Sequence, residues 1–202
     1  MSRLYHHIPV LADECVAGLD IKPGGVYVDG TAGSGGHSAR IAELLITGRL
    51  ISIDRDAEAV AETARTLAPY ADKTTIIRDN FNNIPAILDK LYIDHIDGCL
   101  LDLGVSSHQL DTVSRGFSYI LDCPLDMRMD DRQALTAAEI VNTYGEEELS
   151  AIIYNNGDER HARRIARQIV KSRGVRYVGT SAELVNIIET AVPEAKKKTI
   201  RQ

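Results

Sequence analysis

An apolar segment that runs into a glycine-rich turn constrains the fold of this chain more than any other feature of its sequence. Val26-Tyr27-Val28-Asp29 leads into a turn with glycines at positions 30, 33, 35 and 36, and a helix-like segment follows. Further on, a second apolar segment, Leu50-Ile51-Ser52-Ile53, ends in Asp54. A strand, a glycine turn, a helix and a strand that ends in an acid form the floor of a nucleotide-type cofactor site.

Residues 24–104 alternate between strand-like and helix-like patterns. We predict strands at 25–29, 49–54, 74–78 and 96–103, and helices at 37–47, 56–68 and 82–92, with Asp56 as a helix N-cap. This alternation indicates βαβ units and a parallel sheet, and the nearly continuous apolar run at 96–103 favours a strand covered on both faces. Ligands of such sheets bind beyond the carboxyl ends of the strands. The acids expected at these ends are Asp29, Asp54, Asp79 and Asp102.

The remainder of the chain has a different character. A short helix at 12–19 precedes the sheet, whereas residues 105–133 are predicted to be loop and helices are predicted near 136–143, 146–155, 159–172 and 180–191. We therefore expect a cofactor-binding core with four strands at 1–108 and a loop with a helical domain at 109–202. Four strands are fewer than normally complete such a sheet, so we expect an amino-terminal fragment that lacks the remaining core strands.

Composition indicates a globular protein of the cytoplasm. The chain is 44% hydrophobic and 26% charged, no apolar run approaches the roughly 20 residues of a membrane helix, and the amino terminus lacks a signal-peptide core. Its three cysteines, Cys15, Cys99 and Cys123, fit neither a disulfide framework nor a zinc site, which favours a reducing compartment. His6 and His7 are more typical of surface residues than of metal ligands, so we predict no metal.

Charge is distributed unevenly along the chain. The net charge is −6, yet residues 158–202 hold eleven Lys or Arg against five Asp or Glu. Within the helix predicted at 159–172, one stripe is basic and the opposite stripe is apolar. The basic stripe is a solvated surface in one interpretation and an RNA-phosphate contact in the other; it consists of Arg160, Arg164, Arg167 and Lys171.

Several details favour S-adenosylmethionine over a dinucleotide as the cofactor. The third glycine of the dinucleotide fingerprint is missing, because His37-Ser38 follows Gly36. Asp29 stands immediately before the turn, where an acid suits a ligand that carries an ammonium group. Asp54 is placed to accept the ribose hydroxyls, and Phe81 offers an aromatic face to adenine. No phosphate-binding lysine follows the glycines, which excludes a P-loop.

Several motifs together resemble one family. They are His7-Ile8-Pro9-Val10-Leu11, the 29–38 loop, Asp102-Leu103-Gly104-Val105-Ser106-Ser107-His108-Gln109-Leu110, Ser114-Arg115-Gly116-Phe117-Ser118, Pro124-Leu125-Asp126-Met127-Arg128-Met129-Asp130 and Arg163-Arg164-Ile165-Ala166-Arg167. This combination is similar to that of the bacterial 16S ribosomal RNA (cytosine-N4) methyltransferases over essentially the whole chain.

The resemblance implies a class I methyltransferase, a Rossmann-like α/β fold, with a helical domain inserted after the fourth strand. It implies methyl transfer from S-adenosylmethionine to a cytosine amine in the decoding region of 16S ribosomal RNA, as naked RNA or as the small subunit. Carried over position by position, the cofactor contacts are Gly35, Gly36, His37, Asp54, Phe81, Asp102 and Gln109.

The proton acceptor of this reaction stays open at the level of sequence. Many amino-methylating enzymes carry an Asp/Asn-Pro-Pro-aromatic loop after the fourth strand, whereas this chain has Asp102-Leu103-Gly104-Val105. The candidates are Asp102, Asp126 and Asp130; Asp102 has a competing role against the cofactor, and the other two equally suit ion pairs with Arg128 and Arg132 as loop scaffolding. Ser106 and Ser107 either bind the base or cap a turn. Two other functions remain as alternatives, an NAD-dependent oxidoreductase and a non-catalytic RNA-binding fragment.

Overall fold

The structure, a computed structural model, describes residues 11–192. The chain divides into two compact units. Among the described residues, the first unit holds 11–104 together with Met129–Asp131, and the second holds Val105–Arg128 and 132–192. The chain therefore passes between the units three times, and the boundary expected after residue 108 falls within the second unit.

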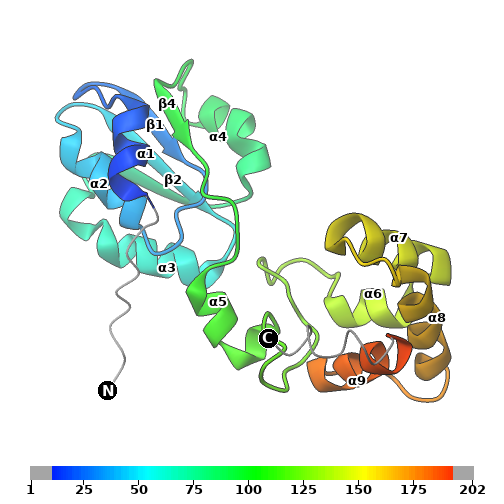
Figure 1. The fold of residues 1–202 in the computed structure, drawn as a ribbon. Coiled ribbons are helices and arrows are strands. Elements are labelled where there is room, and N and C mark those ends of the chain that lie inside the picture. The colour runs from blue at the N-terminus through cyan, green and yellow to red at the C-terminus, as the bar shows by residue number, and fades with distance from the viewer. Residues whose placement is uncertain (1–10, 193–202) are drawn as a thin grey trace, which may run out of the picture. The chain divides into compact units, whose positions relative to one another are not determined.

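The first unit is built on a parallel four-stranded sheet with the order β3-β2-β1-β4 (Figure 1). This confirms the predicted α/β class. The strands are β1 (Val26–Asp29), β2 (Arg49–Asp54), β3 (Thr74–Arg78) and β4 (Gly98–Leu100). Because all four strands are parallel, their carboxyl ends lie along one edge, where Asp29 is paired with Ser52 and Asp54 with Arg78.

Strand β4 is much shorter than the 96–103 predicted from its apolar run. It pairs only with β1, and its last partner is Asp29, after which the chain turns into the glycine loop. Leu100 therefore ends the ladder. Cys99 is exposed, and Leu101 and Leu103 are 45% and 68% exposed, so the prediction of a strand covered on both faces was wrong for the described residues.

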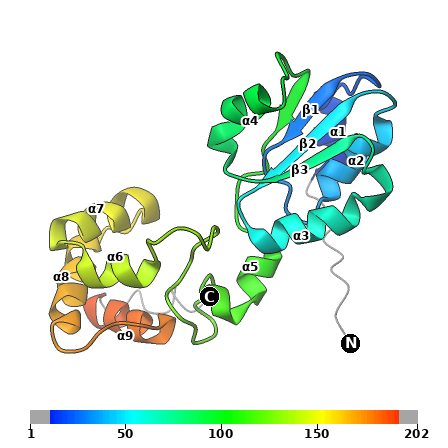
Figure 2. The ribbon, with the colours of Figure 1, turned by 180° about the vertical axis from the view of Figure 1, so that it is seen from behind.

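Alternating side chains fill a core on each face of the sheet. Tyr27 and Leu50 pack on one face with residues of α2 (Gly36–Leu44), and Val28 and Ile51 pack on the other with residues of α4 (Ile84–Lys90). Figure 2 shows α2 and α4 on opposite sides of the strands. The first face is also covered by α1 (Ala12–Leu19) and α3 (Ala57–Thr66), followed by a 3-10 turn at Ala68–Tyr70.

Helix α3 begins where the sequence predicted. The Asp56 carboxylate accepts a hydrogen bond of 3.0 Å from the backbone N–H of Glu58, which confirms Asp56 as the N-cap. The 105–133 segment, predicted to be loop, contains a short helix, α5 (Ser107–Asp111), and a 3-10 turn at Val113–Arg115. A capping box between Ser106 and Gln109 starts α5, so Ser106 caps this helix.

Four helices form the core of the second unit. They are α6 (Ala137–Thr143), α7 (Glu146–Gly157), α8 (Ala162–Arg173) and α9 (Ser181–Ala191). Ile165, Ala166 and Ile169 form the buried face of α8, as the sequence predicted. The helix begins at Ala162 instead of 159, so Arg160 lies in the preceding turn. No helix among residues 11–192 is long and apolar enough to cross a membrane.

Candidate functional site

The glycine turn after β1 needs glycine at two positions. Gly33 and Gly35 have φ angles of +56° and +83°, which side-chain-bearing residues rarely adopt. A Cβ atom on Gly35 would lie 3.2 Å from the Cα atom of Thr63 in α3. The hydroxyls of Thr63 and Thr66 donate to the carbonyls of Gly33 and Ser34, at 3.0 and 2.7 Å. The turn is therefore held against α3 in one conformation.

Helix α2 begins directly at this turn. Gly35 is its N-cap, no side chain of the described residues caps it, and its first turn contains no acid. A helix start of this kind favours an anionic group, because free backbone N–H groups and the helix dipole are both positive there. His37 is 6% exposed, and its Nδ1 atom lies 4.0 Å from the Asp102 carboxylate.

Asp29 lies inside the turn and not at its surface. Asp29, Ser38 and Ser52 are each 0% exposed. The Ser38 hydroxyl lies 2.6 Å from one Asp29 oxygen and 2.8 Å from the Ser52 hydroxyl, and the backbone N–H of Thr31 donates to the other Asp29 oxygen. Burial raises the pKa of Asp29. The carboxylate thus orders the turn from within, whereas the sequence suggested an acid that a ligand's ammonium group would meet.

Asp54 joins the turn to the end of β2. One carboxylate oxygen accepts from the backbone N–H of Gly33 and the other from that of Asp56, both at 2.9 Å. Burial raises the pKa of Asp54, although the residue remains only half-buried. Each carboxylate oxygen can accept more than one hydrogen bond, so Asp54 keeps the capacity to accept from a ligand hydroxyl.

Phe81 and Asp102 lie at the same edge of the sheet. Phe81 begins a 3-10 turn at Phe81–Asn83 after β3, and a Cβ atom on Gly30 would lie 3.1 Å from its Cβ atom. The backbone N–H of Asp102 donates to the Thr31 hydroxyl at 2.7 Å, and the Asp102 side chain is 52% exposed. The first unit thus brings together six of the seven predicted cofactor residues: Gly35, Gly36, His37, Asp54, Phe81 and Asp102.

The seventh predicted cofactor residue, Gln109, belongs to the second unit. It is 6% exposed, and its side-chain oxygen accepts from the backbone N–H of Ser106, 3.0 Å away, as part of the capping box. This contact gives the burial of Gln109 a structural reason. A contact between Gln109 and the cofactor stays a prediction.

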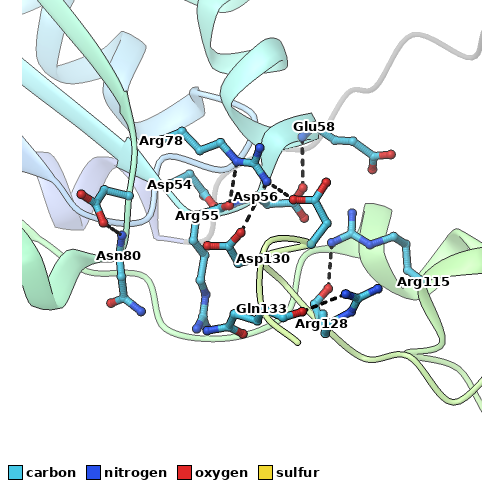
Figure 3. Close-up of polar contacts among 12 residues, drawn as sticks. Asp54, Arg55, Asp56, Glu58, Arg78, Asn80, Arg115, Arg128, Asp130 and Gln133 are labelled. Atoms are coloured by element: carbon cyan, nitrogen blue, oxygen red, sulfur yellow. Dashed lines mark hydrogen bonds and ion pairs between the residues drawn. The ribbon is translucent and has the colours of Figure 1, made fainter. Parts of the chain in front are cut away.

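Two of the three candidate proton acceptors are engaged by arginines. The Asp126 carboxylate accepts from the Nε and Nη2 atoms of Arg128, at 2.9 and 2.7 Å, and these hydrogen bonds lower the pKa of Asp126. Asp130 is 8% exposed and pairs with Arg78 at the end of β3 (Figure 3). Sequence reasoning had offered Arg128 and Arg132 as partners and had missed Arg78.

The basic stripe is exposed, as an RNA contact requires. Arg160, Arg164, Arg167 and Lys171 are all exposed. Arg167 forms an ion pair of 3.3 Å with Glu146 in the first turn of α7, and at this exposure the pair is worth little. Among the described residues, no group of three His, Cys, Asp or Glu side chains is arranged to hold a metal ion. His6, His7 and the first motif of the resemblance up to Val10 lie outside the described residues.

Comparison with known proteins identifies the family. A family model described as "MraW methylase family" matches residues 4–202. The chain belongs to this family. It is 48% identical over 196 residues to the "Ribosomal RNA small subunit methyltransferase H" of Lachnospira eligens, and 48% identical over 196 residues to the protein of that name from Brevibacillus brevis. Each match covers 96% of this chain and 62% of the relative, so the chain spans less than two thirds of these relatives' length.

A solved structure with a related description covers part of the chain. The crystal structure of a putative rRNA-methylase from Clostridium thermocellum matches with a TM-score of 0.41 and 28% identity, over 54% of this chain and 60% of that one. Family membership confirms the resemblance that the sequence motifs indicated, and it lends no support to an NAD-dependent oxidoreductase.

The buried Asp29 predicts a pH dependence of stability. Its pKa is raised above the ordinary value of 3.8, so its favourable contribution to folding is full below pH 3.8 and is lost as the pH rises through the folded-state value. We expect the free energy of unfolding of Asp29→Asn, measured in urea, to increase relative to the unmodified chain between pH 4 and pH 7. If the difference in unfolding free energy between Asp29→Asn and the unmodified chain stays constant with pH, the pKa of Asp29 is not raised. Asp89→Asn, at an exposed position, is the control.

Proposed function

We propose that this protein transfers a methyl group from S-adenosylmethionine to the exocyclic N4 amine of a cytosine in the decoding region of 16S ribosomal RNA. The observation that carries the proposal is the glycine turn, held between Asp54 and α3, in a chain of the MraW methylase family. The relatives' names supply ribosomal RNA of the small subunit. The cytosine amine comes from the family resemblance of the motifs after β4.

The residues at the sheet edge fit S-adenosylmethionine chemically. The uncapped start of α2 suits the carboxylate of its amino acid part. Asp54 suits the two ribose hydroxyls, and Phe81 suits adenine. The half-exposed Asp102 carboxylate, which follows β4 at the same edge, is reachable from solvent. When bound, S-adenosylmethionine supplies a methyl group activated by a sulfonium.

In the proposed reaction, the protein must position the cytosine amine, which is a poor nucleophile. The cytosine amine is weakly nucleophilic because its lone pair is delocalised into the ring, so the protein must hold the nitrogen about 3–3.5 Å from the methyl carbon and in line with the departing sulfur. A hydrogen-bond acceptor on the amine localises the lone pair and receives the proton. We assign this acceptor to Asp102, since Asp126 and Asp130 are engaged by Arg128 and Arg78.

The second unit is proposed to hold the RNA. A paired cytosine must be extruded before its amine can be reached, and an exposed aromatic ring can stack on an unpaired base. Tyr119 is 64% exposed, whereas Phe117 is half-buried. The exposed stripe of Arg160, Arg164, Arg167 and Lys171 suits the phosphate backbone.

One assay tests the whole proposal. The chain is incubated with small ribosomal subunits from a strain that lacks this methylation, in parallel with naked 16S RNA, and with S-adenosylmethionine that carries a tritiated methyl group. We expect label in N4-methylcytidine after digestion to nucleosides. RNA binding without label supports the non-catalytic alternative for this chain. Thermal stabilisation by NAD and not by S-adenosylmethionine would refute the cofactor assignment.

Substitution of Asp54 tests the cofactor site. Because hydrogen bonds to a charged group are worth about 1.5–3 kcal/mol, we expect Asp54→Ala to weaken S-adenosylmethionine binding by at least about tenfold in calorimetry. Asp54→Asn keeps an acceptor for the Gly33 N–H and separates loss of charge from loss of loop order. Asp72→Ala, an exposed acid at the opposite end of the sheet, is the matched control. Unchanged affinity in both Asp54 variants would refute this placement.

Charge reversal on α8 tests the RNA surface. We expect Arg164→Glu and Arg167→Glu to weaken RNA binding while the affinity for S-adenosylmethionine stays unchanged. The slope of log K against log salt should flatten by about 0.7 per lost phosphate contact on single-stranded RNA. Arg65→Glu, on an exposed arginine of α3, controls for net charge. RNA affinity at low salt equal to that of the unmodified chain would leave the stripe as a solvated surface.

A further inference from the structure

The short segment Met129–Asp131 belongs to a different unit from the residues that precede and follow it in the sequence. It belongs to the first unit, whereas the residues on both sides of it, up to Arg128 and from Arg132, belong to the second. Three residues cannot form a core of their own, so side-chain contacts must hold the segment in the first unit. Two arginines at the carboxyl edge of the sheet, Arg55 and Arg78, make such contacts.

Arg78 makes the central contacts. It is the last residue of β3, and its Nη2 atom lies 3.4 Å from a carboxylate oxygen of Asp130 and also donates to Asp131. Its Nε atom donates to the carbonyl of Arg55 at 3.3 Å. The Arg55 guanidinium in turn donates to the sulfur of Met129. Figure 3 shows Arg78 between the strand ends and Asp130.

Burial makes the Arg78–Asp130 contact stronger than a surface ion pair. The side chains of Arg78 and Asp130 are 29% and 11% exposed, whereas those of the Arg65–Glu62 pair on α3 are 73% and 35% exposed. Removing one partner of a shielded ion pair costs more than removing one partner of an exposed pair, so we expect the loss of Arg78 to loosen the segment.

The two arginines also adjoin the proposed cofactor residues. Arg55 follows Asp54 directly, and Arg78 is separated from Phe81 by Asp79 and Asn80. Asp54 and Arg78 are paired across β2 and β3. The strand ends that carry the proposed cofactor residues therefore also carry the two arginines that hold the segment.

We propose that Arg78 is a positioning residue that fixes the Met129–Asp131 segment to the cofactor edge of the sheet, so that cofactor binding and the order of this segment favour each other. The cofactor half of the inference rests on the proposed function. Linkage requires the effect to be reciprocal: a ligand that binds better when the segment is docked also holds the segment docked. Arg78 acts on the loop that leads into the second unit and does not contact the reacting atoms.

Limited proteolysis measures the docking directly, because trypsin cleaves after Arg128 and Arg132, on either side of the segment. Without ligand, we expect Arg78→Gln to raise the cleavage rate at these two bonds by about tenfold, as the loss of a charged, shielded hydrogen bond predicts. Arg78→Lys should restore much of the protection, and Arg65→Gln, at the exposed ion pair, should leave it unchanged. Cleavage of Arg78→Gln within about twofold of the unmodified chain overturns the proposal.

Two additions keep the test decisive. If Arg78→Gln lowers the melting temperature, Asp130→Asn releases the segment from the opposite side, and its cleavage at the same bonds decides. Saturating S-adenosylmethionine should slow cleavage at these bonds in the unmodified chain and not in Arg78→Gln, an effect that a merely structural ion pair would not produce. Binding without slower cleavage overturns the coupling. No binding to the unmodified chain refutes the proposed cofactor, and the ligand-free cleavage rates then judge the docking alone.

Discussion

A buried carboxylate at the end of β1 is the contact on which the rest of the site depends. Asp29 has no exposure, and hydrogen bonds from Ser38 and Thr31 fix the path of the chain on both sides of the glycine turn. Because Ser38 lies in α2 and Ser52 in β2, this one group joins a strand end, a helix and the neighbouring strand. The turn can therefore present its backbone in one geometry without help from a ligand.

The architecture of the first unit was largely predictable because its signals are local. Period-two burial of Tyr27 and Val28 on opposite faces, glycines at positive φ and the Asp56 cap each act over a few residues. The length of β4 was not predictable in this way. Its apolar run continues to Leu103, but a strand needs a hydrogen-bonded partner, and β1 ends at Asp29. An apolar run indicates which residues tend to be buried, but it does not indicate where the hydrogen bonds between β1 and β4 end.

In the candidate site, too, features set by local sequence were predictable and contacts between distant residues were not. The positions of Asp54 and Phe81 at the carboxyl edge of the sheet were predictable, because strand ends can be read from the sequence. The Arg78–Asp130 contact joins residues 52 positions apart, and no periodicity or spacing connects them. Asp126, in contrast, pairs with an arginine two positions away, which local sequence reasoning had offered as an alternative. The fold determines which distant segments come close enough to form ion pairs. The sequence alone therefore could not distinguish Asp126 from Asp130, whereas the structure pairs them with different arginines, Arg128 and Arg78.

For the methyl transfer proposed above, the chemistry favours as proton acceptor the most exposed of the three candidate acids, Asp102. Attack by the cytosine amine leaves a positively charged nitrogen that loses its proton readily, so the acceptor needs the correct position more than a raised basicity. A carboxylate held by two arginine nitrogens, as Asp126 is, has its lone pairs and its orientation committed. Asp102 follows the end of β4; its backbone N–H donates to the Thr31 hydroxyl, and its half-exposed carboxylate lies 4.0 Å from the Nδ1 atom of His37. An anchored backbone with a half-exposed carboxylate is the combination that we propose for accepting a proton from an incoming base.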